Sequence, residues 1–163
     1  CEWKGIDFSM FWQGVAKRDL WLDGPMFWGI SGGEWQSTGL KEHLDYYRPE
    51  NTTSVFGPNT NAYFPKMYMS KDMNQKVQTR YLQNGAYARL KNIQLGYTFP
   101  TQIINKLHMQ KLRVYVSAEN VLTITSLPSG FDPETTYSSY SDGNSGKTYP
   151  LQTTISFGLN ATF

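Results

Sequence analysis

The last eleven residues of the chain alternate between apolar and polar side chains with a period of two, and no other feature limits the fold as strongly. One set of alternate positions is Thr153, Ile155, Phe157, Leu159, Ala161 and Phe163, and the other is Thr154, Ser156, Gly158, Asn160 and Thr162. Successive side chains of a β-strand point to opposite faces of its sheet. The range 153–163 is therefore predicted to be a strand with one apolar and one polar face.

Three further segments show the same alternation, over residues 4–17, 87–99 and 111–123. The pattern of the third segment breaks at Asn120, Val121 and Leu122, where we expect a β-bulge. Pro100 follows the second segment and ends it, because proline cannot donate to a strand ladder. The chain is thus predicted to form four strands and to be all-β.

The connections between these strands alternate between long and short. Residues 18–85 and 126–150 form two long connections, whereas 100–110 is short and its isoleucines predict one helical turn. Within the first long connection, a short amphipathic helix is predicted from the spacing of Leu40, His43, Leu44 and Tyr47. Outer-membrane β-barrels have short periplasmic turns and long extracellular loops. If the chain ends in the periplasm, every connection falls on the side that this rule requires.

Strand length and composition favour a membrane barrel over a soluble β-sandwich. The predicted strands exceed the usual globular length of about 5–6 residues and match the ~9–11 that cross a bilayer at a tilt. Charged residues are 17% of the chain, against about 25% in soluble domains. Aromatic residues lie near the predicted strand ends, at Trp3, Trp12, Tyr97, Phe99 and Phe163. The smallest barrels need about eight strands, so the chain is predicted to be a fragment of an antiparallel transmembrane barrel. A soluble, secreted carbohydrate-binding β-sandwich is the alternative.

The sequence offers no candidate for catalysis, a cofactor or a metal site. His43 and His108 fall on opposite sides of the membrane in this topology and are expected at surfaces or interfaces. Cys1 is the only cysteine, which excludes an internal disulfide. Asp132 and Glu134 flank a proline and are interpreted as loop residues rather than as ligands. The net charge of +2, with the two signs interspersed, argues against nucleic-acid binding.

Four segments, taken in order, resemble the C-terminus of SusC/RagA-type TonB-dependent transporters of Bacteroidota. They are YARLKNIQLGYTFP at 87–100, LRVYVSAENVLTIT at 112–125, FDPE at 131–134 and YPLQTTISFGLNATF at 149–163. Residues 5–21 and 46–52 also look similar to this region. The resemblance implies that residues 1–163 are the C-terminal part of a 22-stranded barrel domain, supply its last four strands, and are not an enzyme. It places the protein in the bacterial outer membrane, with 18–85 and 126–150 extracellular and with the turn 100–110 and the C-terminus periplasmic.

The resemblance also implies a function and a set of partners. Such transporters import glycans or peptides together with a SusD-like surface lipoprotein, and TonB contacts the plug region in the missing N-terminal part. The remaining partners are the rest of the transporter chain and outer-membrane lipid. A passive porin wall, which lacks the plug, is a further alternative.

Two groups of residues are predicted to be functional. The family resemblance implies that the final strand is similar to a signal that the barrel-assembly machinery reads. The residues of this signal are Ile155, Phe157, Leu159, Ala161 and Phe163. Flat aromatic rings suit sugars, peptide side chains and protein interfaces alike. The aromatic residues of the first loop are therefore candidates for contact with substrate or lipoprotein, although most are expected to pack the loop or face the lipoprotein: Trp21, Trp28, Trp35, Tyr46, Tyr47, Tyr63 and Tyr68.

Overall fold

The computed structural model describes residues 1–32, 39–68, 73–105, 108–136, 146 and 148–163. These residues form two compact units. The first consists of 1–17, 86–126 and 151–163 and is a β-sheet; the second consists of 18–85 and 127–150, the two long connections. Trp35 lies outside the described residues. The predicted all-β fold is confirmed.

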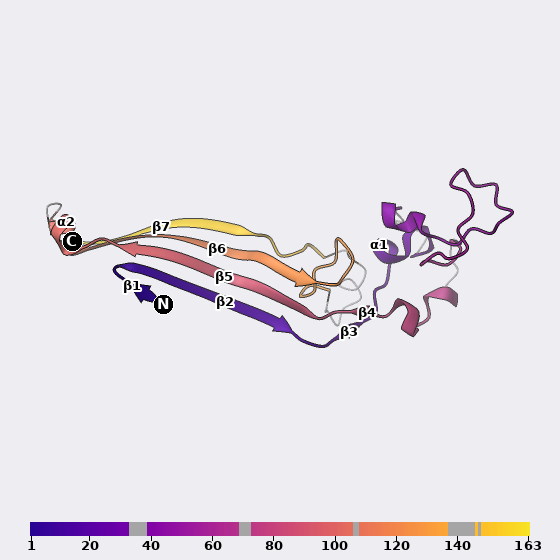
Figure 1. Ribbon diagram of the computed structural model, residues 1–163, viewed down its shortest axis with the longest axis horizontal. Helices are drawn as coiled ribbons and strands as arrows, with labels where there is room; N and C mark the ends of the chain where they lie inside the picture. Colours follow the sequence, from indigo (N-terminus) through magenta and orange to yellow (C-terminus); the bar gives the residue numbers. More distant parts are fainter. Residues whose placement is uncertain (33–38, 69–72, 106–107, 137–145, 147) are drawn as a thin grey trace. The chain divides into compact units, whose positions relative to one another are not determined.

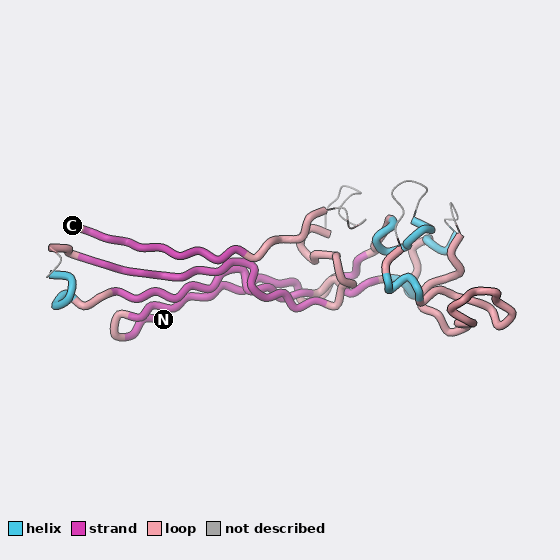
Figure 2. The backbone as a smooth tube through the Cα atoms, turned by 90° about the horizontal axis from the view of Figure 1, so that it is seen from above, coloured by secondary structure: helices cyan, strands magenta, loops and turns pink. Residues whose placement is uncertain are grey.

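The sheet of the first unit is an antiparallel meander in the order β1-β2-β5-β6-β7. Figures 1 and 2 show the four long strands side by side. The strands are β1 Glu2–Trp3, β2 Ile6–Val15, β5 Tyr87–Thr98, β6 Lys111–Thr125 and β7 Thr154–Thr162. The four predicted strands are therefore present, and none of their ends differs from the expected one by more than two residues.

A tight turn changes the start of the first predicted strand. Lys4 and Gly5 have φ angles of 47° and 86°, and Trp3 pairs directly with Ile6. Two consecutive positive φ angles define the two-residue type I′ hairpin turn. A Cβ on Gly5 would lie 2.6 Å from the carbonyl oxygen of Thr98, so this position also needs glycine for space. The strand therefore begins at Ile6, and β1 adds a short fifth strand to the sheet.

The predicted bulge in β6 is confirmed. The register between β5 and β6 shifts between Leu90 and Asn92, and Asn120 has a φ of 52°. Asn120 Nδ2 donates to the carbonyl oxygen of Gln152 at 3.1 Å, and its own carbonyl accepts from Thr153 Oγ1 at 2.9 Å. These bonds connect the bulge to the residues that enter β7, so the bulge helps to fix where the last pairing begins.

The short connection between β5 and β6 contains the predicted helical turn. It is α2, Thr101–Ile104, which follows Pro100. Ile104 is almost fully buried, and the backbone N–H of Phe99 donates to the carbonyl oxygen of Leu112 at 2.9 Å. The connection is thus packed as well as short.

The second unit is built mainly from loops around an aromatic core. Its regular elements are β3 Asp19–Leu20, β4 Gln83–Asn84, α1 Pro25–Trp28, η1 Gly29–Gly32, η2 Lys41–Leu44, η3 Met73–Gln75 and η4 Thr79–Tyr81. β3 and β4 pair and bring the ends of the first long connection together. The predicted helix over 40–47 is only the 3₁₀ turn η2, because Asp45 leaves helical geometry with a ψ of 49°. The buried core is Leu20, Leu22, Phe27, Trp28, Phe64, Tyr81, Leu127 and Phe131.

Candidate functional site

One face of the sheet is apolar across four strands. The strand register places Phe8, Leu95, Val116 and Phe157 in one row. The neighbouring rows are Ile6, Tyr97, Val114, Leu159 and Met10, Ile93, Ala118, Ile155. Leu95 is 49% exposed and Phe157 84% exposed. A continuous exposed apolar face of this kind suits the lipid side of a barrel wall.

A soluble sandwich would cover this face with a second sheet at about 10 Å. Within the described ranges, the only other sheet is the β3–β4 pair, which matches two residues of one strand with two of the other. That pair is far too small to cover a face four strands wide. The geometry therefore favours the barrel wall over the sandwich.

The opposite face of the sheet is polar and carries small side chains. One row consists of Ser9, Gln94, Ser117 and Ser156. The next row is Asp7, Gly96, Tyr115 and Gly158. In a barrel with its apolar face toward lipid, these rows line the lumen.

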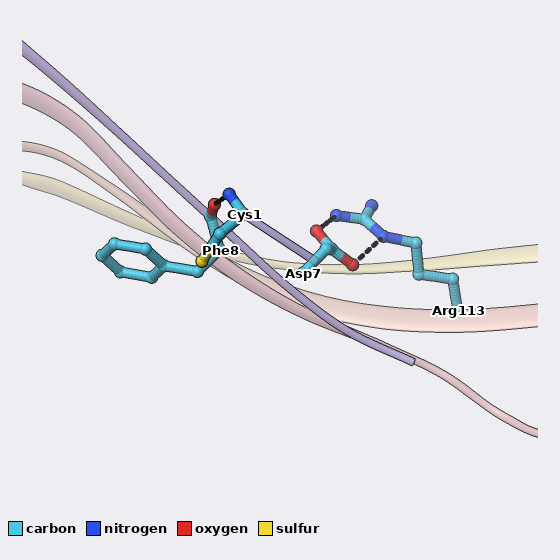
Figure 3. A network of polar contacts seen from close by, with 4 residues as sticks. All are labelled: Cys1, Asp7, Phe8 and Arg113. Atoms are coloured by element: carbon cyan, nitrogen blue, oxygen red, sulfur yellow. Dashed lines mark hydrogen bonds and ion pairs between the residues drawn. The ribbon is translucent and has the colours of Figure 1, made fainter. Parts of the chain in front are cut away.

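A bidentate ion pair between Asp7 and Arg113 crosses the polar face (Figure 3). Arg113 Nε donates to Asp7 Oδ2 at 2.9 Å, and Arg113 Nη2 donates to Asp7 Oδ1 at 2.5 Å. A Cβ on Gly96 would lie 2.4 Å from Asp7 Oδ2 and 2.6 Å from Arg113 Nη2. Glycine is therefore needed between the two strands so that the carboxylate and the guanidinium can meet. Two parallel hydrogen bonds fix the guanidinium plane.

Tyr115 extends this cluster toward β7. The guanidinium carbon of Arg113 lies 4.8 Å from the centre of the Tyr115 ring, within range of a cation–π contact. The ring lies over Gly158, where a Cβ would be 2.1 Å from Tyr115 Cζ. Asp7, Arg113 and Tyr115 are hereafter the polar cluster, and Gly96 and Gly158 give it space. Sequence analysis did not find the cluster, because its members come from strands far apart in the chain.

The predicted assembly residues lie together on the apolar face of β7. Ile155, Phe157 and Leu159 are 62%, 84% and 64% exposed, and Phe163, which follows the strand, is 78% exposed. Ala161 pairs with Leu112 on β6 and is partly buried. Their recognition by an assembly machine stays a prediction.

The predicted contact residues of the first loop are not equally accessible. Trp28 is 2% exposed and its Nε1 donates to the carbonyl oxygen of Leu22 at 3.2 Å, so it is a core residue and its predicted contact role is corrected. Trp21 and Tyr46 are partly buried against the same core. The exposed members are Tyr47 at 40%, Tyr63 at 37% and Tyr68 at 47%.

The prediction of a surface or interfacial His43 is wrong. Its side chain is 5% exposed and packs against the Phe64 ring. Nδ1 is 2.9 Å from the backbone N–H of Leu40, and Nε2 is 3.1 Å from the carbonyl oxygen of Phe27. Because the Leu40 N–H can only donate, Nδ1 accepts and Nε2 carries the proton. His43 is therefore a core residue that ties two loop segments together.

Arg48 has a structural role that sequence analysis missed. Its Nε donates to the carbonyl oxygen of Gly57 at 2.6 Å, and Nη1 donates to that of Leu44 at 2.8 Å. The guanidinium lies 4.7 Å from the centre of the Tyr46 ring. Arg48 thus fixes the segment 49–58 to the rest of its unit. A lone arginine in a loop carries no sequence signal for this role.

Asp132 shapes the second long connection, as its loop interpretation predicts. Oδ1 accepts from the backbone N–H of Glu134 at 2.9 Å, and the carbonyl oxygen of Asp132 accepts from the N–H of Thr136 at 2.9 Å. Such local bonds from an aspartate carboxylate stabilise a turn. Arg18 donates to the carbonyl oxygen of Pro133 and joins this turn to the first long connection.

Replacing Asp132 with alanine is expected to loosen this turn without unfolding the protein. Loss of one capping carboxylate costs about 1 kcal/mol, which corresponds to roughly a fivefold rise in local opening. Limited proteolysis of the intact protein measures this as faster cleavage within 127–136. Glu50→Ala is the matched control, because Glu50 is an exposed carboxylate in the other connection. Equal cleavage of the two variants would contradict the assigned role.

The described part of the chain contains no group of three or more histidine, cysteine, aspartate or glutamate side chains placed to hold a metal ion. None of its helices is long and apolar enough to cross a bilayer.

Comparison with known proteins relates the chain to outer-membrane receptors. No family model matches it. It is 35% identical to the TonB-dependent receptor P3 of Formosa agariphila, over 99% of this chain and 15% of that receptor. It is 25% identical to the TonB-dependent receptor P26 of the same organism, over 99% of this chain and 16% of the receptor. The chain thus spans about one sixth of the length of these relatives.

Solved structures show the same fold. The RagAB peptide importer in its open-open state matches with a TM-score of 0.63 and 23% identity, over 99% of this chain and 16% of that chain. The closed-closed state of RagAB matches with a TM-score of 0.62 and 22% identity, over the same shares of the two chains. The arrangement of strands and long connections is therefore that of a segment from a much larger barrel.

Proposed function

Because the chain is a barrel segment of a SusC/RagA-type TonB-dependent outer-membrane transporter, we propose that it forms part of the wall and the extracellular loops through which a nutrient is actively imported. The observation that carries this proposal is the pair of opposite faces on one sheet. An exposed apolar face four strands wide suits lipid, and the polar face behind it suits a hydrated lumen. A passive porin would also have such a wall, but it would not explain the similarity of the chain to TonB-dependent receptors.

The connections of the sheet support a direction for the wall. The β1–β2 turn and the connection that contains α2 both lie at the end of the sheet where β7 ends, as Figure 2 shows for α2 and the chain's final residue. The two long connections leave from the opposite end, where Val15, Tyr87 and Thr125 align. Short turns belong to the periplasmic side and long loops to the cell exterior. Residues 18–85 and 126–150 are then extracellular.

The proposed cargo is a glycan or a peptide that is delivered with a SusD-like lipoprotein. Support comes from the loop unit, whose exposed rings include Tyr47, Tyr63 and Tyr68. Tyrosine combines a flat apolar ring with a hydroxyl, which suits both sugar rings and protein interfaces. The RagAB structures, named as a peptide importer, provide a precedent for the peptide alternative. TonB is expected to act through the part of the transporter outside this chain.

The first test uses the native outer membrane. We expect this polypeptide to migrate with a heat-modifiable barrel several times its own mass and to co-purify with a surface lipoprotein, identified by mass spectrometry. Uptake of the cargo should stop when the TonB system is inactivated. A monomeric polypeptide that stays soluble without detergent would refute the barrel, and uptake that persists without TonB would support a passive pore instead.

A further inference from the structure

A groove of about 550 Å³ lies on the apolar face of the sheet, toward the end that carries the short turns. In its rows, Val114 lies beside the larger Tyr97 on β5, and Val116 lies beside the larger Phe157 on β7. The apolar side chains that line the groove are Ile6, Leu95, Tyr97, Val114, Val116 and Phe157. Sites for small molecules usually measure about 300–1,000 Å³, so this space is large enough for an elongated apolar group.

A tryptophan and a lysine lie at the rim of this groove. Trp3 pairs directly with Ile6, so its side chain lies on the same face as the groove. The Trp3 ring is 66% exposed, and Lys4 Nζ lies 4.8 Å from the centre of that ring. Among the described residues, no carboxylate forms an ion pair with Lys4. The apolar groove therefore has a cation beside it that the sheet does not neutralise.

The position and charge of this site select its occupant. In the proposed orientation the short turns face the periplasm, so the groove lies at the depth of the inner leaflet, which consists of phospholipid. An acyl chain suits the groove, a phosphate suits Lys4, and tryptophan is favoured at the level of lipid headgroups. Glu2 and Asp7 pair on the polar face, so they leave no carboxylate at the rim for the ammonium of a zwitterionic headgroup. A headgroup with a net negative charge is therefore favoured.

We propose that the groove and Lys4 form a site for one anionic phospholipid of the inner leaflet. The acyl chain lies along Val114 and Val116, and the phosphate binds the Lys4 ammonium above the Trp3 ring. The inference rests on the proposed function, because it requires a barrel whose short turns are periplasmic. It differs from general contact with the bilayer, in which lipids exchange freely along the wall, because one molecule is retained at one place.

The test is native mass spectrometry of the full-length transporter in a mild detergent, titrated with phosphatidylglycerol. Lys4→Asn removes the cation and keeps the turn, because asparagine followed by glycine is a preferred type I′ pair. We expect this variant to bind one phosphatidylglycerol about fivefold more weakly than the wild type. Lys17→Asn is the matched control, because Lys17 is exposed just beyond the opposite end of β2. The control should bind as the wild type does.

A second variant tests the groove itself. Val114→Phe places a ring where the acyl chain is proposed to lie, and loss of contact with roughly two methylene groups should weaken binding about tenfold. Ile93→Phe is its control, because Ile93 lies on the same apolar face and does not line the groove. Both variants remain apolar, so both barrels should fold and show heat-modifiable mobility.

The outcomes separate this inference from the proposed function. If no heat-modifiable barrel is found for the wild type, the transporter proposal fails. If the barrel folds and Lys4→Asn and Val114→Phe bind phosphatidylglycerol as tightly as their controls do, the lipid site is refuted while the transporter stands. Equal binding of phosphatidylethanolamine refutes the role of Lys4 in selecting an anionic headgroup. Equal competition by lipopolysaccharide refutes the assignment to the inner leaflet.

Discussion

Val116→Arg is expected to destabilise the assembled barrel by about 2–4 kcal/mol, whereas Ser117→Arg, one residue further along the same strand, should cost much less. Val116 lies near the middle of the apolar face, between Leu95 and Phe157 in its row. Ser117 lies on the opposite face, between Gln94 and Ser156. An arginine at the first position places a charge in hydrocarbon, and at the second it extends into a hydrated lumen.

This pair of substitutions tests which face meets lipid. Urea unfolding of the full-length transporter in lipid vesicles measures the two stabilities, and heat-modifiable gel mobility reports the folded fraction. Both variants carry the same new charge on the same strand, so a difference between them reports only the face. Equal stabilities, or a larger loss for Ser117→Arg, would refute the assignment of the apolar face to lipid.

The sheet could be predicted from the sequence because its signal is local. A period of two in side-chain polarity depends only on neighbouring residues, so each of the four strands could be predicted from its own segment. The loss of that period at Asn120 predicted the bulge. The turn at Lys4 and Gly5 was missed because Lys-Gly is not one of the residue pairs, such as Asn-Gly or Asp-Gly, that mark a type I′ turn in a sequence. Only the positive φ angles of the two residues reveal the turn.

The interior of the loop unit could not be predicted, because its packing depends on residues far apart in the chain. His43 and Trp28 look like surface residues in the sequence. The structure buries His43 through its bond to Phe27, sixteen positions away, and buries Trp28 against Tyr81. Nothing in a single segment shows that these partners will meet.

The polar cluster is also a product of the register. Asp7 and Arg113 are 106 positions apart, and they meet because β2 and β6 both pair with β5. Shifting β5 by one residue would exchange Gly96 for a residue with a side chain and would turn every side chain of that strand to the other face. The pairing of the strands therefore decides whether the cluster exists.

Gly158→Val is expected to lower the stability of the barrel by about 1–3 kcal/mol, the usual cost of forcing a side chain into occupied space. The new Cβ would lie 2.1 Å from Tyr115 Cζ, so either the ring must leave the strand or β7 must move away from β6. Both responses weaken the pairing of Tyr115 with Gly158 in the middle of the β6–β7 ladder. Urea unfolding and the heat-modifiable fraction of the full-length transporter measure the loss.

A second substitution identifies the cause of this loss. Tyr115→Ala removes the ring and should itself destabilise the barrel, because Gly158 loses the aromatic side chain that covers it. In the double variant the valine occupies the space that the ring has left, so the two costs should not add, and a coupling of about 0.5–3 kcal/mol is expected. Strict additivity would show that valine acts through the backbone of β7 rather than through the ring. The expected coupling would instead show that Tyr115 on β6 and Gly158 on β7 are matched in size. This match constrains the register of β7, which the alternating pattern of β7 alone does not fix.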